Sequence, residues 1–96
     1  MKKKIIKKTI LITHREGGSP EVVEIEGENE KELIYSLYEL WFNIMYSVGE
    51  DDEILNDIVE GDISKEEILN KIKYDNLNYF LNNLNLKNEH IYSILW

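Results

Sequence analysis

The densest group of chemically capable side chains in this sequence is a run of carboxylates. Residues 50–67 contain nine aspartates and glutamates and one lysine. Six of these acids fall on one predicted helix over residues 50–60: Glu50, Asp51, Asp52, Glu53, Asp57 and Glu60. Such a helix is about 16 Å long, and duplex DNA carries one charge per ~1.7 Å, so the two charge densities agree within about a factor of two. The run can imitate a phosphate backbone, or it can be a solvated face that aids solubility.

Other site chemistry has little support in the sequence. The acids at 50–53 lack the alternating oxygen ligands and the central glycine of a calcium loop. His14 and His90 each lack a second ligand at helical or strand spacing, which argues against a metal site. The chain has no serine in a nucleophile elbow and no glycine-rich phosphate loop. We therefore expect a protein that is not an enzyme and that has no catalytic residues, metal or cofactor.

Charge is strongly segregated along the chain. Residues 1–15 carry six basic side chains and no acid, whereas residues 16–69 carry seventeen acids against Lys31 and Lys65. The net charge is −8. A field of this sign repels nucleic acid and attracts basic protein surfaces. The amino-terminal lysines lack the glycine-rich loop or interleaved aromatics of a nucleic-acid site, and we expect Lys7 and its neighbours to offset glutamates on the next strand.

Length and composition predict one ordered globular domain over residues 1–96. Hydrophobic residues make up 43% of the chain and aromatic residues 10%, which is more than disordered chains of high charge contain. There is no cysteine, so disulfides are excluded and a reducing cytosol is compatible. Lysines interrupt the first apolar run, and no eighteen consecutive residues are apolar, so we expect neither export nor a membrane partner. The abundance of Lys, Asn and Ile suggests a low-GC bacterium or its phage, and we expect a cytoplasmic protein.

A β-hairpin is predicted at the amino end. Residues 4–13 and 21–26 alternate between apolar and polar positions, and the segment between them is rich in turn residues. Pairing Ile12 with Val23 aligns the apolar faces and places Lys7 opposite Glu28. We predict an antiparallel hairpin in this register.

A long helix is predicted from Asn29 to about Val48. Asn29 and Glu32 have the spacing of a capping box, and Gly49 ends the pattern. Apolar residues, Leu37 and Trp41 among them, cover roughly two thirds of its circumference, where a surface helix has a stripe of about 100°. Such a helix is either wedged between two layers or part of a binding face. Three aromatic residues extend the arc and are candidates for core or interface: Tyr35, Phe42 and Tyr46.

Three to four short helices are expected to follow the long one. The patterns run over residues 50–60, from a capping box at Ser64 and Glu67 to about Tyr74, and from about Leu77 onward. In the first of these, Glu53, Asp57 and Glu60 are expected to point outward. Residues 89–96 fit either a short helix or a third strand, and the helix is the preferred interpretation. The predicted fold class is α+β, with the hairpin packed on the long helix.

Two functions are compatible with these features. The first is a small acidic inhibitory protein that occupies a basic, nucleic-acid-handling surface of another protein, with phage anti-CRISPR proteins or nuclease-immunity proteins as concrete cases. The partner would be a basic protein, with no direct binding of nucleic acid. The alternative is a small structural or regulatory subunit that forms a homodimer, or docks in an assembly, through its aromatic helix face. The acidic run and the aromatic face both remain candidate interfaces.

Overall fold

The computed structural model describes residues 4–47, 52–87 and 90–96, and its fold belongs to the α+β class. Strands β1 (Ile6–His14) and β2 (Glu21–Gly27) form the expected hairpin, and helix α1 (Glu30–Ser47) follows. Three shorter helices come next in the described chain: α2 (Asp52–Glu60), α3 (Lys65–Lys71) and α4 (Leu77–Lys87). Strand β3 (His90–Ile94) ends the series and completes an antiparallel sheet of order β2-β1-β3.

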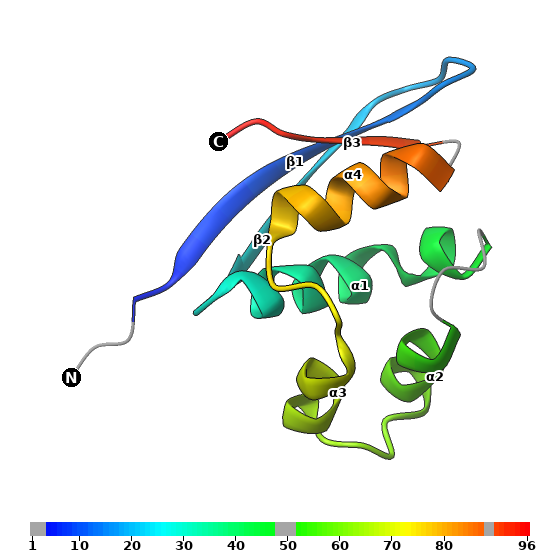
Figure 1. Cartoon of the computed structure of the whole chain (residues 1–96). Coiled ribbons are helices and arrows are strands. Elements are labelled where there is room, and N and C mark those ends of the chain that lie inside the picture. Colours follow the sequence, from blue (N-terminus) through cyan, green and yellow to red (C-terminus); the bar gives the residue numbers. More distant parts are fainter. Residues whose placement is uncertain (1–3, 48–51, 88–89) are drawn as a thin grey trace.

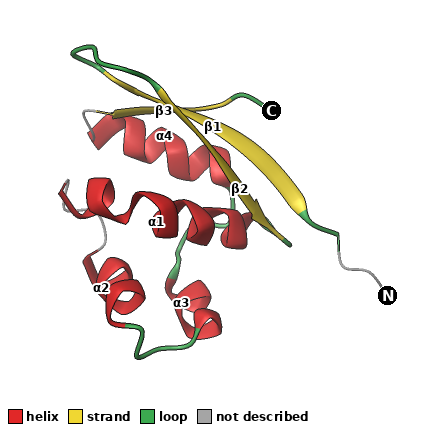
Figure 2. Ribbon diagram, turned by 180° about the vertical axis from the view of Figure 1, so that it is seen from behind, coloured by secondary structure: helices red, strands yellow, loops and turns green. Residues whose placement is uncertain are grey.

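The elements are stacked so that α1 lies between two layers (Figures 1 and 2). One face of the sheet is covered by α1, which contacts β2, and by α4, which contacts β3. Helices α2 and α3 pack on the other side of α1. This position explains the wide apolar arc of the long helix, since each layer requires its own apolar stripe. Leu33, Ile34, Leu37 and Tyr38 are all buried.

The hydrophobic core joins the sheet to all four helices. The inward face of the hairpin contributes Ile10, Ile12 and Ile25, with Val23 half-buried beside them. The later helices contribute Ile54, Ile68, Leu77, Phe80, Leu81 and Leu84. Tyr38 of α1 lies 5.5 Å from Phe80 of α4, measured between ring centroids. The predicted packing of the hairpin on the long helix is thus confirmed.

The predicted hairpin register is wrong by two residues. Ile10, and not Ile12, lies opposite Val23, and Lys7 faces Glu26 in place of Glu28. The Lys7 Nζ atom is 4.0 Å from a Glu26 carboxylate oxygen. Glu28 is not available for this pairing because β2 ends at Gly27, where the chain turns closely onto α1. A shift of two residues preserves the side-chain alternation, so the apolar face still points inward.

The predicted helix starts are confirmed at Asn29 and Ser64. The Glu32 N–H donates to Asn29 Oδ1 at 3.0 Å, and the Glu67 N–H donates to Ser64 Oγ at 3.3 Å. Each side chain thereby satisfies one of the free N–H groups in a first turn. The Glu32 carboxylate reaches back to the Glu28 N–H at 3.1 Å, one residue before the expected position.

The preferred helical interpretation of the tail is wrong, since residues 90–94 form β3 along the free side of β1. Tyr92 is buried opposite Ile12. The Asn85 side chain then bonds the Tyr92 backbone on the far side of the strand, with the Tyr92 N–H donating to Oδ1 at 2.7 Å and Nδ2 donating to the Tyr92 carbonyl at 3.1 Å. The Tyr92 N–H and carbonyl point away from β1 and are both satisfied by Asn85, while the residues on either side of Tyr92 pair with β1. Together these contacts favour the period of two over the helical period.

Candidate functional site

Four exposed carboxylates gather where α2 ends and α3 begins. Glu60 ends α2, Asp62 lies in the connection, and Glu66 and Glu67 occupy the first turn of α3. Gly61 adopts a φ of 70°, which lets the chain leave α2 sharply. We call Glu60, Asp62, Glu66 and Glu67 the acidic surface.

The structure describes the other acids predicted as binding residues to different extents. Glu50 and Asp51 lie outside the described residues, and for Asp52 and Glu53 only the helical backbone is described. Asp57 does not point outward as expected. Its side chain is only 14% exposed, and Oδ2 accepts a hydrogen bond from Lys71 Nζ at 2.7 Å. Asp57 therefore links α2 to α3 and is not part of an exposed row with Glu60.

Both lysines of α3 have partners within the protein. Lys71 is paired with Asp57. Lys65 lies 3.9 Å from Glu32 Oε1, and its Nζ sits 5.2 Å above the centre of the Tyr35 ring on α1. These are a weak ion pair and a cation–π contact. No recorded ion pair in the described chain reaches the acidic surface, so its carboxylates face solvent without a neutralising cation.

The predicted aromatic face is described at only one of its three positions. Tyr35 is half-buried and packs against the core, and Lys65 lies over its ring. Burial, and secondarily the nearby Glu39 carboxylate, raise the pKa of Tyr35, so its phenol stays neutral at physiological pH. Phe42 and Tyr46 belong to α1, but their side chains lie outside the described residues. Tyr35 thus acts as a core-packing residue, and the sequence did not reveal its contact with Lys65.

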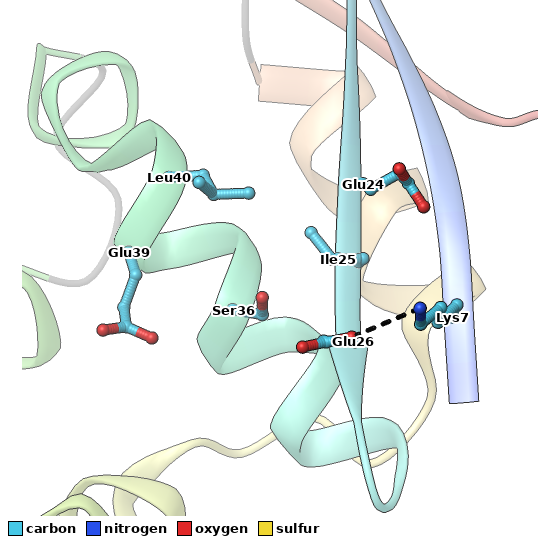
Figure 3. A pocket seen from close by; sticks show the side chains of 7 residues that line it. All are labelled: Lys7, Glu24, Ile25, Glu26, Ser36, Glu39 and Leu40. Carbon is cyan, nitrogen blue, oxygen red and sulfur yellow. Dashed lines mark ion pairs between the residues drawn. The ribbon is translucent and has the colours of Figure 1, made fainter. Parts of the chain in front are cut away.

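A groove between β2 and α1 was not predicted from the sequence. It has a volume of about 480 Å³ and is lined by Lys7, Glu24, Ile25, Glu26, Ser36, Glu39 and Leu40. In Figure 3, Ile25 points from β2 toward α1, and Leu40 points from α1 toward β2. Leu40 is 53% exposed. The groove therefore combines an apolar floor with carboxylates from the strand and the rim.

The structure also brings together two histidines that the sequence separates. His14 and His90 occupy opposite positions on β1 and β3, with ring centroids 4.1 Å apart. Their spacing in the sequence gives no sign of this contact, because the contact depends on the pairing of β3 with β1. They form a pair only, and the described residues contain no cluster of three or more potential metal ligands.

Comparisons with known proteins add no assignment. No family model, curated protein or solved structure matches the chain. Among the described helices, none combines the length and apolar character needed to cross a membrane.

Proposed function

We propose that this protein is a small acidic binding protein that docks on a basic, nucleic-acid-handling surface of another protein and blocks it. The observation that carries the proposal is the acidic surface. Its four carboxylates are exposed, while the lysines of the same helix are held by Asp57, Glu32 and Tyr35.

The contacts of Lys65 with Glu32 and of Lys71 with Asp57 affect the electrostatic potential that a partner would meet at this region. A lysine already held by a carboxylate or an aromatic ring contributes less to the outward field, so the negative potential of the four acids persists into solvent. Such a field accelerates encounter with a basic surface and disfavours nucleic acid itself. The overall charge of −8 acts in the same direction.

The concrete class we propose is a phage-type inhibitor of a host defence nuclease, such as an anti-CRISPR protein, or an immunity protein for a nuclease. The small size, the segregated charge and the Lys-, Asn- and Ile-rich composition support this class. The alternative of a subunit that docks through an aromatic helix face has less support, because Tyr35 packs against the core beneath Lys65.

The test uses charge reversal at exposed positions. The variant Glu60→Lys, Asp62→Lys, Glu66→Lys changes three side chains of the acidic surface. Its control, Glu16→Lys, Glu28→Lys, Asp75→Lys, makes the same change in net charge at exposed positions elsewhere. Asp57 is left intact, since a lysine there would face Lys71 at the site of a 2.7 Å contact.

Tagged parent protein and both variants would be used to capture proteins from a low-GC bacterial lysate at low salt. We expect captured partners to bind duplex DNA or RNA, to lose that binding when the parent protein is added, and to associate more slowly with the acidic-surface variant than with the control. The difference should shrink as salt rises, because the Debye length falls from ~10 Å at 0.1 M to ~3 Å at 1 M. Equal association rates for the two variants would contradict a role for the acidic surface. Simultaneous binding of nucleic acid and this protein would contradict the blocking function.

A further inference from the structure

The two outer edges of the sheet differ in how their backbone groups are satisfied. Thr9 of β1 donates its N–H to the Trp96 carbonyl and accepts the Leu95 N–H, both at 2.8 Å, so the backbone groups of Thr9 point toward β3. Since these groups alternate along a strand, those of Lys8 and Ile10 point toward β2, where they meet Ile25 and Val23.

The same alternation fixes the outward groups of both edge strands. On β3, the groups of Tyr92 point away from β1, and the Asn85 side chain bonds both of them. On β2, the outward groups belong to Val22, Glu24 and Glu26. In the described part of the chain, no recorded hydrogen bond reaches these outward groups of β2. The β3 edge is closed by a side chain at its centre, whereas the β2 edge is open.

The open edge lies beside the groove between β2 and α1 (Figure 3). We propose that this edge binds an extended segment of a basic protein, which adds to the sheet as a fourth strand antiparallel to β2, in keeping with the other strand pairs. Strand addition supplies main-chain hydrogen bonds, and alternate side chains of the added segment supply specificity. This inference concerns a different surface from the acidic surface and does not depend on it.

The residues of β2 specify the side chains of the segment. On an added strand, residues opposite Glu24 and Glu26 share the outer face of the sheet with these carboxylates, so lysine or arginine is favoured there. The preference is stronger opposite Glu24, because the Glu26 carboxylate already lies 4.0 Å from Lys7 Nζ. Intervening residues fall on the face of Ile25 and Leu40, where apolar side chains are favoured. The expected segment therefore alternates basic and apolar residues.

A second copy of this chain is a poorer occupant. Pairing two β2 edges would bring two rows containing Glu24 and Glu26 together on one face, and like charges in cross-strand positions are destabilising. Charged residues on edge strands commonly prevent such self-pairing. The same carboxylates that oppose a second β2 edge favour a basic strand.

The test uses a fluorescent heptapeptide that alternates Lys and Val, beginning and ending with Lys, with capped ends. One isomer carries methyl groups on the backbone nitrogens of its two internal lysines, whose N–H groups would face β2. The other carries them on the backbone nitrogens of its first two valines, whose N–H groups would face solvent. Binding is measured by fluorescence anisotropy. We expect backbone methylation at the lysines to weaken binding by about tenfold or more, because each lost main-chain hydrogen bond corresponds to roughly a two- to tenfold change in affinity. Backbone methylation at the valines should change the affinity less than about threefold, since this modification removes no hydrogen bond to the protein.

A pair of protein variants provides the reciprocal control. Glu24→Gln removes the charge and keeps the outward N–H, whereas Glu24→Pro removes both without disturbing a hydrogen bond to β1. We expect the proline variant to bind the heptapeptide roughly two- to tenfold more weakly than the glutamine variant. Amide exchange of both variants confirms that Ile10 and Val23 remain protected and that the sheet is intact.

Amide exchange of the parent protein identifies the occupied edge. Without peptide, the Glu24 and Glu26 amides should exchange faster than the Val23 and Ile25 amides, and saturating heptapeptide should slow them by about tenfold or more. The reversal variant at Glu60, Asp62 and Glu66 should retain heptapeptide binding within about threefold, which separates this proposal from the proposed function. The inference is overturned if the heptapeptide does not bind, if both methylated isomers lose affinity equally, or if Glu24 gains no protection. Protection that rises with protein concentration alone would assign the edge to a second copy and also overturn it.

Discussion

Replacement of Asn85 by alanine should loosen β3 at a single, defined point. The Asn85 side chain forms two hydrogen bonds with the Tyr92 backbone, at 2.7 and 3.1 Å, in a partly buried setting. Alanine removes both bonds and leaves the Tyr92 N–H and carbonyl to find water at the strand edge. The Asn85 carbonyl, which accepts from the Arg15 guanidinium, belongs to the backbone and is retained.

The expected loss of stability follows from these two bonds. Each is worth about 0.5–1.5 kcal/mol net, so together they contribute about 1–3 kcal/mol to the free energy of unfolding. Alanine is a better helix former than asparagine by up to ~0.7 kcal/mol, which offsets part of this loss. With an m-value of about 1–2 kcal/mol/M in urea for a small domain, a net loss of 1–2 kcal/mol shifts the unfolding midpoint by roughly 0.5–2 M.

The assay combines urea unfolding with amide exchange, and Asn82→Ala is the control. Asn82 is exposed on the same helix, so this variant measures the change in helix propensity separately. We expect Asn82→Ala to be neutral or slightly stabilising, and Asn85→Ala to lower the midpoint and speed exchange of the Tyr92 amide. If the two variants unfold at the same urea concentration and Tyr92 exchange is unchanged, the side chain does not secure β3.

Four further predictions test the packing, one helix start and one ion pair by urea unfolding. Leu37→Ala should lower the free energy of unfolding by about 2–5 kcal/mol because Leu37 is fully buried between the layers, and an unmoved midpoint would place it on the surface. Ser64→Ala should cost about 1 kcal/mol by removing the cap of α3, and Ser64→Asp should restore most of it. Gly27→Ala should cost about 1–3 kcal/mol, because its Cβ would lie 2.5 Å from Glu32 Cβ, and a neutral result would contradict this close approach. Asp57→Asn should destabilise the protein more than Glu60→Gln, since only Asp57 is paired with Lys71; equal effects would show that this ion pair adds nothing.

Much of the fold could be predicted because short-range patterns agreed with long-range packing. The caps at Asn29 and Ser64 depend on residues three positions apart, and both are present. The wide apolar arc on α1 predicted either a helix between two layers or a binding face, and the structure places α1 between two layers. The cap of α4 was also visible in principle, since Asn76 stands directly before the apolar pattern and its Oδ1 accepts from the Tyr79 N–H at 2.9 Å.

The errors arose where partners distant in the sequence decide the structure. The tail became a strand because β1 has a second free side and because Asn85 can bond the Tyr92 backbone, and neither fact is visible within residues 89–96. The hairpin register moved because Gly27 must approach Glu32 closely, which ends β2 before Glu28. Local alternation predicts which face is buried, whereas the register depends on how the chain continues into α1.

For the candidate surfaces too, the sequence predicts the charge but not which side chains are exposed. The excess of acid was evident from the sequence, but the count of carboxylates could not distinguish Asp57, which is held by Lys71, from Glu60, which faces solvent. Nor could the count show that Lys65 lies near Glu32 and over the Tyr35 ring. Among the described carboxylates of the acidic run, Asp57 is thus withdrawn from the surface that a partner would meet, whereas Glu60, Asp62, Glu66 and Glu67 face solvent. Because the open β2 edge also carries glutamates, both surfaces proposed for binding select for positive charge, and a basic partner could contact them through different parts of its structure.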